Sequence, residues 1–569
     1  METSKSVASK DLGDMLLDAK MITEEKLQHI RDLQTKDGDK IEHILLQERL
    51  ITAQQLAFFT SLQLRVPFVN LKKEGVRPNA VALIPEPLAR KYNVIPIDAT
   101  EDVMVLAMED PRDIEAIEEL AALTRKRIEP VLSSSQDIQE MIDLNYRVGG
   151  EIEEQLSQIP TRYQGQKELR VTESRVSAEA IAQAPVVRAI DLLIKQAVRD
   201  RASDVHVEPQ EDRLRVRYRI DGILHEVMSL PLSVHPPLLS RVKIMAGLNI
   251  AERRRPQDGQ ITFDMGDREI DLRVATANTV YGEMVVLRIL DKAFAFLPLP
   301  EIGFLPDTLK TYLDMVKTPF GMILISGPTG SGKTTTQYAT VNQLDSVGRN
   351  IITIEDPVEY RFTNINQMQV HPAAGVSFAT GLRACMRLDP DVILVGEIRD
   401  TETAQIGTQA SLTGHLVLSS VHANDTVSTV YRMIDLGVEP FLLASAVVGI
   451  TAQRMVRRVC PYCSRPTPVS PDEQMAYEKE MNEERSMFLI GAGCNFCANT
   501  GYLGRAGIFE IMVMSEEIRR LILSGASSDE IRVQAIKEGT VLLWHDGMKK
   551  VKEGITTPYE VIRNVFSIT

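Results

Sequence analysis

The motif Gly-Pro-Thr-Gly-Ser-Gly-Lys-Thr at positions 327–334 constrains the fold of this chain more than any other feature. It follows the apolar run MILIS (322–326) and precedes a helical pattern. This is the strand, loop and helix context of a phosphate-binding P-loop, whose backbone N–H groups wrap phosphates at a helix N-terminus. Lys333 would reach the outer phosphates, and Thr334 would offer its hydroxyl to Mg²⁺. We therefore predict an ATP site, and not an empty glycine-rich turn, at Gly327, Pro328, Thr329, Gly330, Ser331, Gly332, Lys333, Thr334 and Thr335.

Three later apolar runs end in polar side chains: NIITIE ends in Glu355, DVILVGE in Glu397 and HLVLSSVH in His422. The carboxyl ends of parallel strands meet at one edge of a sheet, where ligands bind. Gly396 stands where a metal-holding aspartate is common. We therefore expect Glu397 to hold Mg²⁺ through water, together with the hydroxyl of Thr334. Glu355 is then the expected base that orients the attacking water. The alternative is that these carboxylates are ion-paired structural groups.

The pattern along the chain predicts a multidomain α/β protein. From residue 296 strands alternate with helices, which is typical of a parallel sheet covered on both faces. We expect an N-terminal helical-repeat and α+β docking domain at 1–145 and a polar linker at 146–175. A small α/β domain follows at 176–295, and the ATPase domain at 296–569 carries a cysteine-containing insertion at 458–500.

The first sixty residues contain an internal repeat. Residues 12–34 align with residues 41–63 at a constant offset of 29 residues. Each half reads as two short amphipathic helices, the second started by Thr23 or Thr52, with Gln55 completing a capping box. The coinciding apolar positions are Leu12/Ile41, Met15/Ile44, Leu16/Leu45, Leu17/Leu46, Met21/Leu50, Ile22/Ile51, Leu27/Leu56, Ile30/Phe59 and Leu33/Leu62.

Four of the five cysteines form two CxxC pairs separated by 30 residues: Cys460, Cys463, Cys494 and Cys497. Four thiolates in this pattern favour a closed tetrahedral zinc site with a structural role. Unliganded cysteines and an iron–sulfur cluster are the alternatives. The charged stretch between the pairs predicts a helical insertion, and the fifth cysteine, Cys385, predicts buried packing.

Charge and hydropathy exclude several classes of function. The chain has 64 basic and 78 acidic residues, a net charge of −14, which disfavours non-specific binding of nucleic acid. The N-terminus lacks the apolar core of a secretory signal, and apolar runs such as 441–450 are too short to span a bilayer. We expect a cytoplasmic protein that contacts membranes only through partners.

The motifs ISGPTGSGKTTT, ITIEDPVEY, LRACMRLDPDVILVGEIRD and TGHLVLSSVHAND occur in this order. Together they resemble the secretion ATPase superfamily that drives type IV pili and type II secretion, where they are called the Walker A motif, Asp box, atypical Walker B motif and His box. ASDVHVEPQEDRLRVRYRIDG, ERRRPQDGQ and LRVATANTVYGEMVVLRILD extend the likeness to about residues 180–569. The resemblance implies a RecA-like C-terminal domain preceded by a small PAS-like domain.

The same resemblance implies a homohexamer with nucleotide bound between these two domains. Arginines of the small domain would complete the site, and the matching positions are Arg273 and Arg288. Without the family, arginines on strands would be read as solvent-facing groups. His415 and His422 match the His box and would sense the γ-phosphate.

The two cysteine pairs and the long N-terminal region separate extension and secretion ATPases of this family from retraction ATPases. The doubled N-terminal helical unit resembles a domain that in some members binds cyclic di-GMP through RLG starts and a later glycine. Here the starts read Asp11-Leu12-Gly13 and Lys40-Ile41-Glu42, and Lys20 and Arg49 stand at the later glycine. Because most of the required residues are missing, we favour a docking role over cyclic di-GMP binding.

The resemblance therefore predicts a hexameric motor at the cytoplasmic face of the inner membrane, with ATP, Mg²⁺ and Zn²⁺ as cofactors. Its expected partners are the platform and alignment proteins of a pilus machine, and its expected work is pilus extension. A type II secretion motor is the close alternative. A nucleic-acid translocase and a non-hydrolysing nucleotide switch are the alternatives from other classes.

Overall fold

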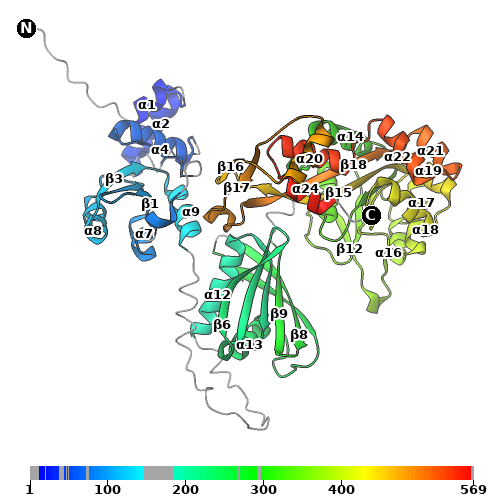
Figure 1. Ribbon diagram of the computed structural model, residues 1–569, viewed down its shortest axis with the longest axis horizontal. Coiled ribbons are helices and arrows are strands. Elements are labelled where there is room, and N and C mark those ends of the chain that lie inside the picture. The colour runs from blue at the N-terminus through cyan, green and yellow to red at the C-terminus, as the bar shows by residue number, and fades with distance from the viewer. Residues whose placement is uncertain are drawn as a thin grey trace, which may run out of the picture. The chain divides into compact units, whose positions relative to one another are not determined.

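The structure, a computed structural model (Figure 1), describes residues 12–19, 21–37, 41, 44–45, 48, 50–71, 76–81, 83–146, 184–266, 268–290 and 297–565. Two compact units are present: one contains residues 1–152, and the other contains most of the remaining chain. Nearly all of the expected linker, from residue 147 on, lies outside the described residues. So do Asp11, Lys20, Lys40, Glu42 and Arg49, on which the expectation about cyclic di-GMP partly depends.

The first unit begins with the helices of the internal repeat, α1 (Leu12–Asp18), α2 (Glu24–Asp37) and α4 (Ala53–Leu64). Equivalent positions of the two halves lie in one apolar core: Leu12, Leu16, Ile22, Ile41, Leu45 and Ile51. The predicted helix starts are confirmed. Thr23 Oγ1 accepts from the Lys26 N–H, and Thr52 forms a reciprocal capping box with Gln55.

A three-stranded sheet follows in the same unit. Strand β1 (Val94–Ala99) pairs antiparallel with β2 (Val103–Met108), which pairs parallel with β3 (Arg127–Leu132). Its helices are α6 (Pro78–Val81), α7 (Glu86–Tyr92), α8 (Ile114–Thr124) and α9 (Ser135–Asn145). Apolar residues of the sheet and of α7, α8 and α9 share one core, so this α+β region has an interior of its own.

The second unit begins with a six-stranded antiparallel sheet of order β6-β5-β4-β9-β8-β7. Along β5 and β8, buried residues alternate with residues that are at least partly exposed, which shows that one face of this sheet is covered. Helix α12 packs against β4, and α13 packs against α12 and β7. The elements are α12 (Ala184–Arg199), β4 (Ala202–Pro209), β5 (Arg213–Ile220), β6 (Ile223–Pro231), α13 (His235–Met245), β7 (Gln257–Asp264), β8 (Glu269–Thr279) and β9 (Gly282–Leu290).

A seven-stranded sheet of order β12-β11-β13-β14-β10-β15-β18 forms the centre of the C-terminal region (Figure 1). Six strands are parallel, and β18 pairs antiparallel with β15 at one edge. The strands are β10 (Gly321–Ser326), β11 (Ile351–Glu355), β12 (Asn366–Gln369), β13 (Val392–Val395), β14 (Leu416–Val421), β15 (Val447–Val459) and β18 (Tyr502–Val513). The fold class is therefore confirmed as a multidomain α/β protein.

Helices cover both faces of this large sheet because its central strands are apolar on both sides. One face packs against α14 and α15, and the other against α16, α17, α18, α19, α21 and α22. Cys385 lies buried in the second of these cores, as predicted. The bounds are α14 (Pro306–Val316), α15 (Lys333–Gln343), α16 (Phe378–Cys385), α17 (Thr401–Leu412), α18 (Thr426–Asp435), α19 (Pro440–Ala446), α21 (Glu516–Leu523) and α22 (Ser528–Lys537).

The predicted helix between the cysteine pairs is confirmed as α20 (Pro471–Met481), which is capped by Ser470. It lies between β16 (Ser464–Thr467) and β17 (Phe488–Gly491), which form a two-stranded sheet. Helix α20 shares a core with the C-terminal helices α23 (Leu543–Lys552) and α24 (Pro558–Val565).

Across the described ranges of both units, no helix has the length and apolar character needed to cross a membrane.

Candidate nucleotide site

The phosphate-binding loop spans the six residues between β10 and α15. Lys333 is half-buried, and its Nζ donates to the carbonyl oxygens of Gly327 (2.9 Å) and Pro328 (3.1 Å). Burial lowers the pKa of Lys333, while the nearby Glu397 carboxylate raises it. Thr334 is exposed, so its hydroxyl is accessible at the start of α15. The loop thus presents one ammonium and one hydroxyl where a P-loop binds phosphates and a metal.

Glu397 and His422 lie together at the ends of β13 and β14. His422 Nε2 is 3.4 Å from Glu397 Oε2, and Arg399 Nη2 is 2.5 Å from Glu397 Oε1. The Glu397 side chain is only 15% exposed, whereas His422 and Arg399 are much more open to solvent. The prediction that these strand ends bring Lys333, Glu397 and His422 to one edge therefore agrees with the geometry.

Gly396, which precedes Glu397, lies close to the neighbouring strand β11. A Cβ at this position would lie 3.3 Å from the Ile354 carbonyl oxygen and 3.5 Å from Glu355 Cα. Strands β11 and β13 are paired here, and the Gly396 N–H donates to the Ile354 carbonyl oxygen at 2.8 Å. A side chain at position 396 would therefore require the two strands to shift by a few tenths of an ångström.

Glu355, at the end of β11, is buried and held by three donors. Thr353 Oγ1 donates to Oε1 at 2.6 Å, Gln367 Nε2 donates to Oε1 at 3.1 Å, and the Tyr338 hydroxyl donates to Oε2. Burial and the Glu355 charge raise the pKa of Tyr338, which keeps this phenol protonated as a donor. Both Glu355 oxygens are thus engaged, and the carboxylate is fixed in orientation.

Arg273 and Arg288 are directly opposite each other on β8 and β9. Arg273 pairs with Glu359 at 3.0 Å and donates to the Val358 carbonyl oxygen, so it reaches the segment that follows Glu355. Arg288 pairs with Asp204 of β4 at 3.0 Å and is largely exposed. Their predicted role at the nucleotide remains a prediction.

His415 lies away from this edge. It directly precedes β14, and its carbonyl oxygen accepts from the N–H of Gly321, the first residue of β10. The phosphate-binding loop follows the other end of β10, so the structure does not bring His415 to the site of its own chain. Its Nδ1 lies 2.8 Å from the carbonyl oxygen of Ala410, so the side chain contacts the last turn of α17.

Sequence reasoning missed three residues that contact the site: Tyr338, Gln453 and Arg454. Tyr338 lies five residues after Lys333, inside α15, where a tyrosine reads as ordinary helix packing. Gln453 Nε2 donates to the Ser331 carbonyl oxygen at 2.6 Å from a strand more than a hundred residues away. The available signal was a polar pair, Gln453-Arg454, between the apolar positions Ala452 and Met455 of the strand.

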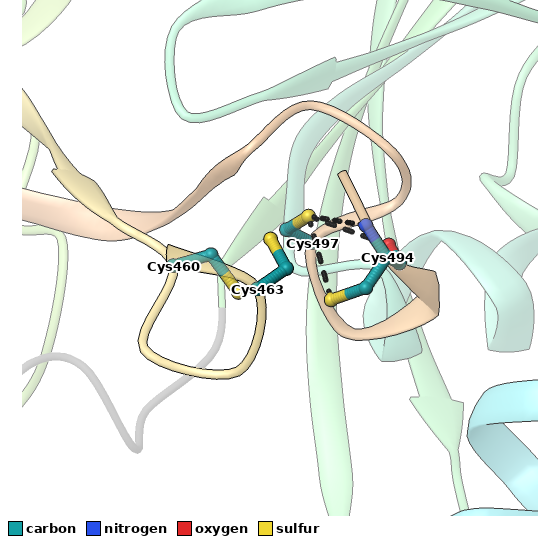
Figure 2. Close-up of side chains that lie close together, drawn as sticks. All are labelled: Cys460, Cys463, Cys494 and Cys497. Atoms are coloured by element: carbon teal, nitrogen blue, oxygen red, sulfur yellow. Dashed lines mark hydrogen bonds between the residues drawn. The ribbon is translucent and has the colours of Figure 1, made fainter. Parts of the chain in front are cut away.

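The four cysteines of the two CxxC pairs converge (Figure 2). Their sulfur atoms all lie within 4.8 Å of one another, and Cys494 Sγ is 3.7 Å from Cys497 Sγ. Four thiolates around one Zn²⁺, with Zn–S bonds of about 2.3 Å, have sulfurs about 3.8 Å apart. The cluster therefore fits a tetrahedral four-thiolate site.

The P-loop between a parallel strand and a helix, with carboxylates at the ends of β11 and β13 in the same sheet, defines a P-loop ATPase. The family described as type II/IV secretion system protein matches residues 179–563, and the MshEN domain matches residues 64–152. The chain belongs to the type II/IV secretion system family. The MshEN match begins where the internal repeat ends, so it covers the three-stranded sheet and its helices.

Two curated relatives span nearly the whole chain. The type IV pilus assembly ATPase PilB of Myxococcus xanthus is 40% identical over 97% of this chain and 98% of its own length. Type II secretion system protein E of Xanthomonas campestris is 36% identical over 98% of each. Among solved structures, the Legionella pneumophila ATPase DotB, at 19% identity, shares the fold with a TM-score of 0.50 over 65% of this chain and 94% of that chain.

Proposed function

We propose that this chain is a hexameric motor that hydrolyses ATP to power assembly of a type IV pilus. The observation that carries the proposal is a site in which Lys333, Glu397 and His422 meet at one sheet edge, within a chain that matches a pilus assembly ATPase over 97% of its length. The expected partners are an inner-membrane platform protein and the alignment proteins of the pilus machine.

Within this site, residues 327–335 bind the phosphates of ATP, and Thr334 and Glu397 would hold Mg²⁺, Glu397 through water. When bound, Mg²⁺ neutralises charge on the phosphates. Glu355 orients the attacking water, because its fixed carboxylate is a pre-positioned acceptor for a water proton. His422 senses the γ-phosphate, and Arg273 and Arg288 complete the site in the hexamer by supplying positive charge to the transferring phosphoryl group.

We propose that Cys460, Cys463, Cys494 and Cys497 bind one structural zinc ion. Metal analysis of the purified chain tests this proposal, and we expect about one zinc per chain. Replacement of Cys497 by serine should abolish stoichiometric zinc and lower the melting temperature, whereas the buried Cys385→Ser variant should keep its zinc. Zinc retained by Cys497→Ser would contradict the assignment.

For the N-terminal region we propose docking to a partner protein. The MshEN match over residues 64–152 makes cyclic di-GMP the ligand to test directly. Titration calorimetry with the full chain decides between these roles, because micromolar affinity would assign a second-messenger site to this unit.

Two experiments test the proposed function. Purified chain should release phosphate from ATP, and Lys333→Ala should abolish the release. Deletion of the gene should then remove pili. The specific observation that favours a second candidate is the match to type II secretion protein E over 98% of the chain; loss of secreted enzymes with normal pili would favour that function.

A further inference from the structure

Gln453 and Arg454 of β15 contact the nucleotide site, but the proposed mechanism assigns them no part in binding or hydrolysis. Strand β15 pairs in parallel with β10 up to the partners Ser326 and Ala452. The next two residues of β15 therefore flank the phosphate-binding loop. Both side chains are buried, with exposed fractions of 1% and 7%. Burying an amide and a guanidinium costs free energy unless they form hydrogen bonds, so their contacts indicate what this position requires.

Gln453 ties the loop to the helix that follows it. Its Nε2 donates to the Ser331 carbonyl oxygen at 2.6 Å, and its Oε1 accepts from Thr336 Oγ1 at 2.8 Å. The loop also packs closely on the Gln453 backbone, because a Cβ on Gly327 would lie 2.6 Å from the Gln453 carbonyl oxygen. Gly327 has a φ of 152° and no side chain, which allows this approach. One residue thus contacts both ends of the phosphate-binding loop.

Arg454 extends this contact to the loop that contains His422. Its Nη1 donates to the Gln453 carbonyl oxygen at 3.1 Å, and its Nη2 donates to the Asn424 carbonyl oxygen at 2.9 Å. Asn424 lies two residues after His422, between β14 and α18. The planar guanidinium therefore spans two backbone segments, one beside the phosphate-binding loop and one beside His422.

The electrostatic effects of the charged groups around Arg454 agree with its position beside the phosphate-binding loop. The positive charge of Arg454 contributes to the lowered pKa of Lys333, after burial and the opposing effect of Glu397, so the two cations lie within electrostatic range. Asp425 and Glu510 raise the pKa of Arg454 against the effect of its burial. The guanidinium thus lies within electrostatic range of Asp425 and Glu510 as well as of Lys333.

We propose that Gln453 and Arg454 are positioning residues that hold the phosphate-binding loop and the His422 loop at a fixed separation. Lys333 and His422 then meet the same nucleotide in a geometry that favours hydrolysis. This inference rests on the proposed ATPase function and adds to it a link between two motifs that are distant in the sequence.

The Arg454→Lys variant tests the link. Lysine keeps the positive charge but lacks the fork that spans two carbonyl oxygens. We expect kcat for phosphate release to fall by about tenfold to a hundredfold, because small misplacements of reacting groups have effects of this size. The Kd of a fluorescent ADP analogue should change by less than about threefold, because the phosphate-binding loop stays tied to Gln453. The Gln453→Met variant should instead weaken ADP binding.

Asn424→Ala is the matched control. The substitution removes the longer contact from Arg454 Nη2 to Asn424 Oδ1, at 3.4 Å, but keeps the 2.9 Å hydrogen bond to the backbone oxygen. We therefore expect kcat to fall by less than about threefold. Melting curves of the full chain separate positioning from misfolding: we expect Arg454→Lys to melt within a few degrees of the unmodified chain. An active unmodified chain with an equally active Arg454→Lys variant would overturn this inference alone. Equal losses of kcat and ADP affinity in Arg454→Lys would also overturn it. An unmodified chain that releases no phosphate would instead overturn the proposed function.

Discussion

The Tyr338 hydroxyl donates a hydrogen bond to Glu355 Oε2, so a residue of the helix that follows the P-loop fixes the carboxylate at the end of strand β11. Glu355→Gln should therefore bind ATP but release phosphate at least about a hundredfold more slowly, because the amide is a poor acceptor for a water proton. Tyr338→Phe leaves the Thr353 and Gln367 donors in place, and its kcat should fall less, by about threefold to tenfold. Steady-state phosphate release and nucleotide binding measure both effects. Native hydrolysis by Glu355→Gln would contradict the assignment of the base.

Replacement of Glu397 should change the metal dependence of the reaction. Glu397 lies beside Lys333 and His422, whereas Glu355 is enclosed by three donors. We expect Glu397→Gln to raise the Mg²⁺ concentration for half-maximal phosphate release by about tenfold. The slow phosphate release that remains in Glu355→Gln should reach its half-maximum at the same Mg²⁺ concentration as in the unmodified chain. If the two variants exchange these behaviours, the division of roles between the glutamates is reversed.

The ion pair between Lys550 and Asp546 on α23 should contribute far more to stability than the exposed pair between Lys317 and Asp314. Both side chains are completely buried, and Asp546 Oδ2 also accepts from the Phe509 N–H at 2.8 Å. Lys550→Met leaves a buried carboxylate unpaired and should lower the free energy of unfolding by about 3–5 kcal/mol. Lys317→Met removes the same side chain from an exposed pair with Asp314 and should cost less than about 1 kcal/mol. Denaturant unfolding of both variants gives the comparison, and similar losses would contradict the expected cost of burial.

The stability of the domain that contains the six-stranded sheet and α13 should decrease at acidic pH. Burial lowers the pKa of His235 from its usual 6.5, although the contact with the Glu283 carbonyl oxygen opposes the shift. In the window just below pH 6.5 the unfolded chain binds a proton on this histidine and the folded chain does not, so this contribution to stability falls as pH falls. His235→Gln keeps a donor for the carbonyl oxygen and should weaken the decrease. Melting temperatures at pH 7.5 and 5.5 measure this difference, and an identical decrease in both proteins would exclude His235 as a cause.

Local motifs made much of this architecture predictable. The P-loop was visible in eight consecutive residues, and Glu397 and His422 followed from the rule that the carboxyl ends of parallel strands meet at one edge. The position of β18 was not predictable, because this strand comes after the cysteine insertion and pairs antiparallel with β15. Gln453 and Arg454 were missed for a related reason. Their partners, Ser331 and Asn424, are distant in sequence, and the spacing of apolar residues along a strand does not predict contacts between polar side chains and distant backbone groups.

The internal repeat has a consequence for how the N-terminal region folds. Leu16 and Leu45 occupy equivalent positions of its two halves, and both are fully buried in the same core. Neither half has an interior without the other, so the two halves should order and unfold together. A shortened version of this protein should therefore keep both halves or remove both, since a cut between them would leave an apolar surface that promotes aggregation.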